Sequence, residues 1–232
     1  MRKVPVAYLQ PGMIVARTVY NDDGYVLLSA GVKIKQRYID QLNNFLIPAI
    51  YIEDSLFPDM DVEDVISEKT RVEAIKTVKE MLGCIKKEAV SGRSLMIHNQ
   101  KLVNTIKDII KDILSQKTLM VNLVDIRSTD SYTFAHSVNV AVLSVLTGIA
   151  MGLSKSALQH LGIGAIMHDV GKVLIPEEIL NKPGTLTQDE YKVIQRHTEF
   201  GFNILDKQPQ ISLLSKKIAL EHHEKYDGSG YP

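Results

Sequence analysis

This sequence has a single cysteine and no net charge. The one cysteine, Cys84, excludes an internal disulfide framework and suits a reducing compartment, so we expect a cytoplasmic protein. Lysine plus arginine total 27 and aspartate plus glutamate total 27, which leaves no net charge. A chain without a long-range field is not drawn to duplex nucleic acid or to an anionic membrane, so an anionic ligand must be bound by local groups.

Long apolar runs are lacking as well. The first 16 residues contain two prolines and no continuous apolar stretch, unlike a secretory signal. The most apolar run, residues 138–151, is shorter than the roughly 18 to 20 residues of a membrane span and contains Asn139. We therefore expect no insertion into a bilayer. With 45% hydrophobic and 23% charged residues, the composition is that of an ordinary globular protein.

A small α+β module is predicted for residues 1–60. Asp23-Gly24 separates two β-prone runs in the manner of a hairpin turn. Residues 35–45 place apolar side chains at helical spacing, and a strand-like run follows at 49–52. The acidic segment 54–61 contains a proline and is the natural linker. The apolar residues of the predicted helix are Ile39, Leu42 and Phe45.

Two amphipathic helices are predicted after the linker. They cover residues 62–89 and 95–114, and Ser91-Gly92 interrupts the pattern between them. We assign residues 61–97 to a helical connector, which either joins the modules or pairs with a second copy of the chain in a homodimer. The apolar stripe of the first helix is Val65, Ile66, Val72, Ile75, Val78 and Leu82.

A mainly helical domain is predicted for residues 98–232. Residues 131–151 are apolar almost all round, as in a helix at the centre of a bundle. Ser154 is a candidate N-cap for a helix that runs to His168. A last helix runs from about residue 211 to a pair of histidines, and a glycine-rich turn follows it.

Thr187 and Glu190 have the spacing of a capping box, which predicts another helix in this domain. Its inward face is predicted to carry Tyr191, Ile194, Gly201, Ile204 and Leu205.

Histidines are concentrated in the same part of the chain, because six of the seven follow residue 130. Five of those six lie where a predicted helix turns its buried face or ends. One such histidine is usually a hydrogen-bonded core residue, but several unpaired imidazoles would cost about 1 to 3 kcal/mol each. Metal ions remove that cost, and imidazole with carboxylate suits iron, manganese, zinc or nickel. His98 and His160 lack such neighbours and are expected to be surface or supporting residues.

Four motifs resemble those of the HD-GYP subgroup of HD-domain phosphohydrolases, in the family's order. The first 55 residues resemble, more loosely, a small module found ahead of such domains. We therefore expect an HD-type helical bundle preceded by the α+β module. The motifs are His136, His168-Asp169-Val170-Gly171-Lys172, His197-Thr198-Glu199-Phe200-Gly201 and His222-His223-Glu224-Lys225-Tyr226-Asp227-Gly228-Ser229-Gly230-Tyr231-Pro232.

The resemblance implies hydrolysis of cyclic di-GMP to the linear dinucleotide or GMP through a metal-bridging hydroxide. It implies two divalent transition-metal ions, with iron or manganese ahead of zinc or nickel. Asp169 and Lys172 are expected to be catalytic, with Lys172 also contacting the substrate phosphate unless it is simply a solvated lysine at a helix end. Tyr231 either stacks on a base or packs its own turn. The expected metal ligands are His136, His168, Asp169, His197, His222 and His223.

Two departures from the family pattern matter. Tyr132 stands where some members carry a glutamate that admits a third metal, so two ions are expected. The family continues past the position of Pro232 with helices that supply another aspartate and basic residues. We therefore expect an impaired or metal-poor site in this 232-residue form.

Two other functions are compatible with the same residues. One is a phosphohydrolase of another nucleotide, such as a mixed cyclic dinucleotide. The other is a sensor or docking module with little turnover, which binds a signalling protein through its Gly-Tyr-Pro residues.

Overall fold

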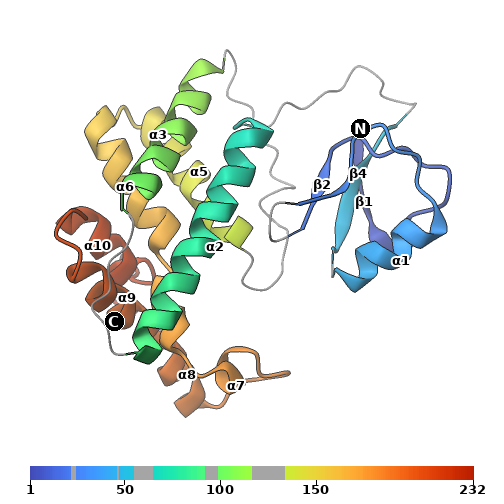
Figure 1. The fold of residues 1–232 in the computed structure, drawn as a ribbon. Coiled ribbons are helices and arrows are strands. Elements are labelled where there is room, and N and C mark those ends of the chain that lie inside the picture. Colours follow the sequence, from blue (N-terminus) through green and yellow to red (C-terminus); the bar gives the residue numbers. More distant parts are fainter. Residues whose placement is uncertain (22–24, 46, 55–64, 92–98, 117–133) are drawn as a thin grey trace. The chain divides into compact units, whose positions relative to one another are not determined.

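The structure is a computed structural model, and it forms two units that are treated separately below. Of the residues that the structure describes, those up to residue 65 make the smaller unit and those from residue 66 on make the larger one. The smaller unit holds the described strands and the larger unit is helical, which confirms the mainly α fold with an α+β module (Figure 1). The residues that the structure describes are 1–21, 25–45, 47–54, 65–91, 99–116 and 134–232.

Two antiparallel strand pairs build the smaller unit. β1 (Arg2–Pro5) pairs with β4 (Ala49–Ile52), and β2 (Val19–Tyr20) pairs with β3 (Val26–Leu28). The second pair confirms the predicted hairpin, although its turn lies outside the described residues. β1 was not predicted, because a four-residue run with one core-facing side chain has no alternation to read.

The helix of this unit is α1 (Gln36–Asn44), preceded by the short 3₁₀ helix η1 (Val6–Tyr8). Of the three apolar residues at helical spacing, Ile39 and Leu42 are buried, but Phe45 is half exposed. Phe45 follows the last helical residue, so its side chain leaves the apolar face of α1. The core between helix and strands consists of Val4, Val6, Leu9, Val15, Leu28, Ile34, Ile39, Leu42, Ile50 and Ile52.

The larger unit is a helical bundle around α5 (Phe134–Ala150). α5 contacts α2 (Glu68–Ser91), α3 (Asn99–Ser115) and α6 (Lys155–Met167), which confirms a central helix there. Ser154 accepts a hydrogen bond from the Ala157 amide and caps α6 as predicted. The predicted boundaries at 60 and 97 remain predictions, but α2 packs in one compact unit with the helices that follow it.

The buried face of α2 differs from the predicted stripe. Val78 is fully buried, but the other predicted helical positions, residues 72, 75 and 82, lie at the margin of the face. Two neighbours cause this, because α2 contacts α5 and α3 at once. The buried residues are Ala74, Thr77, Val78, Met81 and Ile85.

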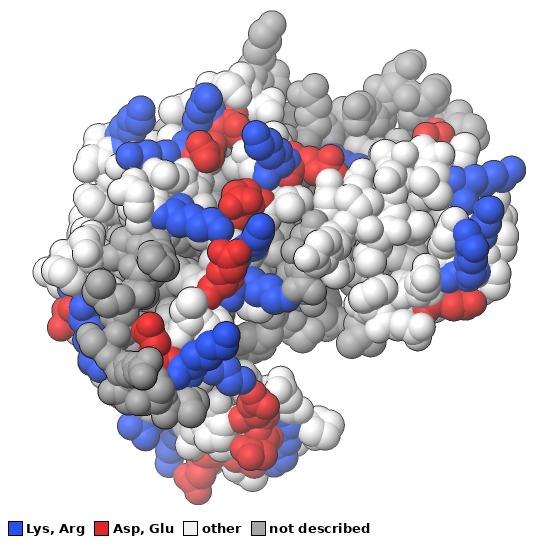
Figure 2. Space-filling model, viewed as in Figure 1, with Lys and Arg blue, Asp and Glu red and all other residues white. Residues whose placement is uncertain are grey.

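The exposed surface of the larger unit carries both signs of charge side by side (Figure 2). Nζ of Lys101 lies 2.7 Å from Oε2 of Glu80, and the Lys86 ammonium pairs with the Glu177 carboxylate. These exposed pairs contribute little to stability, but opposite charges so close together leave no strong field of one sign around them. Among the described residues, none of the helices has both the length and the apolar character that a membrane crossing requires.

After α6 the chain forms a series of short helices. These are η2 (Val170–Leu174), α7 (Glu177–Leu180), α8 (Gln188–Gln195), α9 (His197–Asp206) and α10 (Leu213–Glu221).

The capping box of α8 is present. The Thr187 hydroxyl accepts from the Glu190 amide at 3.2 Å, and the Glu190 carboxylate accepts from the Thr187 amide at 2.7 Å. The single helix predicted from this point is wrong, because Arg196 has a ψ of −8° and separates α8 from α9. The break turns Tyr191 outward, where it is 48% exposed, while the predicted face of α9 is buried.

Candidate metal centre

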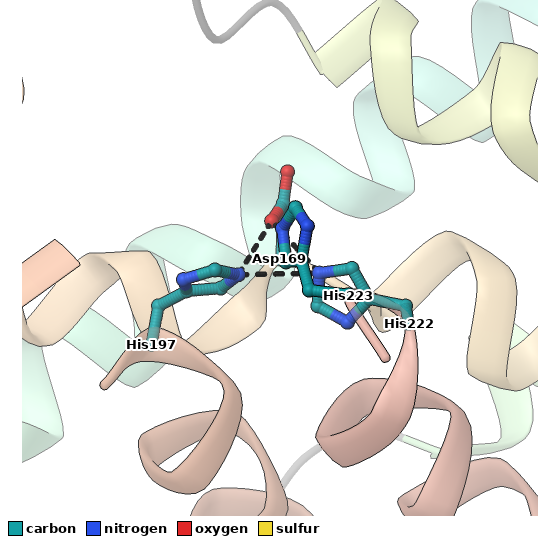
Figure 3. Close-up of side chains that lie close together, drawn as sticks. All are labelled: Asp169, His197, His222 and His223. Atoms are coloured by element: carbon teal, nitrogen blue, oxygen red, sulfur yellow. Dashed lines mark hydrogen bonds and ion pairs between the residues drawn. The ribbon is translucent and has the colours of Figure 1, made fainter. Parts of the chain in front are cut away.

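The predicted metal ligands lie at or near the ends of helices. His136 is in the first turn of α5, His168 caps the C-terminal end of α6, and Asp169 follows it. His197 begins α9 and His222 caps the C-terminal end of α10, with the sixth ligand next along the chain. At a helix end the chain changes direction, so side chains from different helices can point to one place. Figure 3 shows this for Asp169, His197, His222 and His223.

Three imidazoles are oriented by the backbone. Nδ1 of His168, His197 and His222 lies 2.8, 2.7 and 3.1 Å from the carbonyl oxygen three residues earlier. A carbonyl oxygen only accepts, so each Nδ1 carries the hydrogen. When neutral, each of these rings presents the lone pair of Nε2, which is the arrangement of metal-binding histidines.

These Nε2 atoms converge on Asp169. Nε2 of His197 lies 3.3 Å from Asp169 Oδ1, Nε2 of His168 lies 3.1 Å from Oδ2, and Nε2 of His197 and His222 are 3.1 Å apart. In the tautomers set by the backbone, no hydrogen lies between those two nitrogens. Asp169 Oδ1 is buried and has no hydrogen-bond partner among the described residues. A cation at this point satisfies all three atoms, so the donor set fits a metal ion.

The six predicted ligands form two groups of potential donors. Within each group the donor atoms lie within 4.8 Å of one another. Asp169 belongs to both groups, as expected of a carboxylate that serves two ions. We name them the four-ligand group, which is Asp169, His197, His222 and His223, and the three-ligand group, which is His136, His168 and Asp169.

Burial and neighbouring charges set the protonation of the centre. Burial lowers the pKa of His197 to about 4, which keeps its ring neutral. Burial alone would raise the pKa of Asp169, but the neighbouring His168 and His222 hold that pKa well below its usual range. Burial also lowers the pKa of Lys172 to about 8, and its ammonium donates to Asp169 Oδ2 at 2.8 Å. Although burial disfavours the charged ring, Asp169 raises the pKa of His168. The site thus combines a buried ionised carboxylate, imidazoles and one ammonium.

Gly171 explains how these elements come so close. A Cβ added there would lie 1.9 Å from the His197 carbonyl oxygen and 2.4 Å from the Gly201 amide nitrogen. The backbone of η2 therefore touches the backbone of α9, and this contact brings Asp169 to His197. The sequence shows Gly171 and Gly201 only as motif positions, because nothing local indicates which glycine faces another backbone.

Tyr231 lies against a predicted ligand. Its ring stacks on the His223 ring with centroids 4.6 Å apart and planes 17° apart. It also meets Tyr191 edge to face at 6.5 Å, and burial raises the pKa of Tyr231 to about 12. The ring therefore packs beside the metal centre, while its predicted contact with substrate remains a prediction.

The other residues singled out from the sequence lie elsewhere. Nε2 of His160 lies 3.5 Å from the Ser156 hydroxyl on α6, and His160 belongs to neither ligand group. His98 and Tyr132 lie outside the described residues, so the prediction of two ions over three remains a prediction.

Part of this chain is similar to known phosphodiesterases. A cyclic di-GMP phosphodiesterase of Pseudomonas aeruginosa is 35% identical over 127 residues, which is 55% of this chain and 31% of that protein. A cyclic di-GMP phosphodiesterase of Thermotoga maritima is 42% identical over 104 residues, 44% of this chain and 28% of that protein. The 3′3′-cGAMP-specific phosphodiesterase 2 of Vibrio cholerae is 40% identical over 114 residues, 49% of this chain and 22% of that protein.

The matched segments thus span less than a third of the length of these relatives. Residues 108–232 match the HD domain family, which is more than half of the chain and includes every residue of both ligand groups. Together with the homology to HD-GYP phosphodiesterases, this match shows that the chain belongs to the HD domain family.

Proposed function

We propose that this chain carries the metal centre of a phosphodiesterase that hydrolyses a cyclic dinucleotide, with cyclic di-GMP as the first substrate to test. One observation carries the proposal. Nε2 of His197 and Nε2 of His222 face each other at 3.1 Å beside a buried Asp169 oxygen that has no hydrogen-bond partner in the described part of the chain. The electron pairs of these three atoms are suited to binding a cation. The relatives named above supply the substrate class.

Each residue has a definable task in this proposal. The backbone carbonyls orient three imidazoles with Nε2 turned inward, and ionised Asp169 links the two ligand groups. When bound, two divalent ions supply Lewis acidity toward a phosphate and lower the pKa of a water. Lys172 remains mostly protonated at neutral pH and keeps a positive charge where an anionic phosphate arrives.

The ions we propose are iron or manganese, with zinc or nickel as the alternatives. Mixed imidazole and carboxylate donors accept all four. We further propose that the protein is cytoplasmic and that it binds a signalling protein through its Gly-Tyr-Pro residues. Both proposals follow from the proposed substrate, since cyclic dinucleotides are signalling molecules.

A mixed cyclic dinucleotide is the second candidate substrate. The observation in its favour is the 40% identity to the 3′3′-cGAMP-specific enzyme. The ligand groups themselves would not select between bases, because imidazole and carboxylate donors would bind the metal ions and not a nucleobase. Selection therefore requires a direct comparison of substrates.

The test is hydrolysis by protein loaded with manganese or iron. Cyclic di-GMP, 3′3′-cGAMP and their linear products are separated by chromatography. We expect a linear dinucleotide or mononucleotide product, and we expect Asp169→Asn to lower turnover about 100-fold or more, because both groups lose their shared anionic donor. Asp189→Asn is the matched control, since the side chain of Asp189 is 93% exposed.

Two outcomes decide against the proposal. Binding of a cyclic dinucleotide without product, under each metal, would favour the sensor or docking function. Equal turnover by Asp169→Asn and the parent protein would remove the metal centre from the mechanism.

A further inference from the structure

His223 is held differently from the other histidines of the four-ligand group. His197 and His222 each donate from Nδ1 to a backbone carbonyl. Across the described part of the chain, the His223 ring makes no such hydrogen bond. It lies between the His222 ring at 4.3 Å and the Tyr231 ring at 4.6 Å, and it is nearly parallel to Tyr231. Stacking therefore replaces hydrogen bonding as the restraint on this ring.

We infer that Tyr231 is a positioning residue for His223 and that Glu224 is the latch that holds Tyr231 in place. The inference rests on the proposed function in one respect, which is that His223 binds a metal ion. It assigns the tyrosine to the orientation of a ligand, where the sequence suggested contact with substrate or simple packing.

The Glu224 side chain holds backbone amides just after the end of α10. Glu224 Oε1 accepts from the Gly230 amide at 3.0 Å and from the Lys225 amide at 2.8 Å. The Tyr231 amide donates to the His223 carbonyl oxygen at 3.4 Å. Residues 224–232, here named the GYP loop, are thus folded back onto the residue that Tyr231 covers.

Gly230 makes this return path possible. A Cβ at Gly230 would lie 2.5 Å from the Glu224 Cα and 2.5 Å from the His223 carbonyl oxygen. The tip of the loop is braced separately, because Asp227 Oδ1 accepts from the Ser229 amide at 3.0 Å and from its hydroxyl at 2.7 Å. The loop is therefore a defined structure whose two ends meet at His223.

The physical consequence is preorganisation. An imidazole without a hydrogen bond to fix it loses rotamer freedom when it binds a metal. A ring stacked in advance loses less, so metal affinity rises without any contact between Tyr231 and the ion. The effect needs the flat face of residue 231 and not its hydroxyl, which gives the inference a sharp test.

The test is metal affinity, measured by competition with a chelator, together with the visible spectrum of the cobalt-loaded protein. We expect Tyr231→Leu to weaken binding in the four-ligand group about 10-fold and to shift the cobalt spectrum. We expect Tyr231→Phe to restore both, because phenylalanine retains the stacking face. Tyr226→Leu is the matched control, since Tyr226 is a fully exposed tyrosine of the same loop.

A second route uses the latch. Glu224→Ala should weaken binding as Tyr231→Leu does, and Glu224→Gln should retain affinity because its amide oxygen accepts from the same two backbone amides. In a double-mutant cycle, Tyr231→Leu should add nothing to the effect of His223→Ala. The Glu224 variants test the inference even when Tyr231→Leu fails to fold.

The inference is overturned if Tyr231→Leu binds metal as the parent does, if Tyr231→Phe is as weak as Tyr231→Leu, or if the protein binds no metal. The proposed function fails separately. Tyrosine-dependent metal binding without hydrolysis of any cyclic dinucleotide would sustain the inference and reject the function. If Tyr231→Leu hydrolysed the substrate with a raised KM and unchanged metal affinity, the function would be sustained and the inference rejected.

Discussion

The two ligand groups share Asp169 but differ in how their other side chains are held. In the four-ligand group, His197 is completely buried and two rings are fixed by backbone carbonyls, while the third, His223, is exposed like His136 but stacks on Tyr231. In the three-ligand group, His168 has a carbonyl partner, while His136 is exposed and only approaches His168 with ring centroids 5.5 Å apart.

The side chains of the four-ligand group are therefore more restrained, and we call this group the rigid half of the centre. The three-ligand group is less restrained, and we call it the looser half. Rigid donors lose little freedom on binding, so affinity should follow the restraint of the side chains as well as their number. The four-ligand group is therefore expected to bind first and more tightly. The predictions below challenge this contrast, beginning with the largest effect.

Gly171→Ala should abolish the rigid half. The added methyl group overlaps the His197 carbonyl, which is backbone and cannot turn aside. We expect a loss of about 3 kcal/mol or more in the free energy of unfolding, at or beyond the upper range for overpacking, and loss of tight metal binding. Denaturant unfolding and metal titration measure both.

Gly83→Ala is the control for that substitution. Gly83 lies in α2, and nothing lies within 4 Å of an added Cβ. Alanine is the better helix former, so this variant should gain about 0.5 to 1 kcal/mol. If Gly171→Ala were as stable as the parent, the close approach of η2 and α9 would not be what builds the four-ligand group.

Metal addition should stabilise the folded protein through the rigid half first. A ligand at about 100 times its dissociation constant adds about 2.7 kcal/mol when it binds only the folded state. We expect most of the rise in melting temperature to occur at the first equivalent of metal and a smaller rise at the second. Calorimetric scans at stepwise metal additions measure this, and a single step at two equivalents would contradict the contrast.

Single ligand removals should separate the two halves. His136→Ala should leave the first binding step near its parent affinity and remove the second. His197→Ala should weaken the first step by about 10- to 100-fold, because it takes away a buried and oriented donor. Isothermal titration with manganese measures both steps, with His160→Ala as the control outside the ligand groups. Equal losses from the two variants would show that the halves bind as one unit.

Some features of this protein follow from the sequence alone. Thr187 and Glu190 are three residues apart, so their capping box forms within one turn and can be read locally. Ser154 and the antiparallel pairing around residues 22–24 are local for the same reason. The order of the histidine and aspartate motifs likewise indicated the HD domain family, because those residues are chemically distinctive.

Other features depend on packing between distant segments. The break at Arg196, the buried face of α2 and the outward position of Tyr191 arise where helices meet neighbours that a local pattern does not contain. Phe45 shares the helical spacing of Ile39 and Leu42 but is half exposed, because helical spacing does not say where the helix ends.

The metal centre shows the same division. The sequence by itself determined which donors are present and that they lie near helix ends. Only the tertiary structure decided that Nε2 of His197 meets Nε2 of His222, that Gly171 touches the backbone of His197, and that Tyr231 covers His223. The physical reason is that side-chain direction and tautomer depend on helix packing and on carbonyl partners, which are set only when the chain is folded.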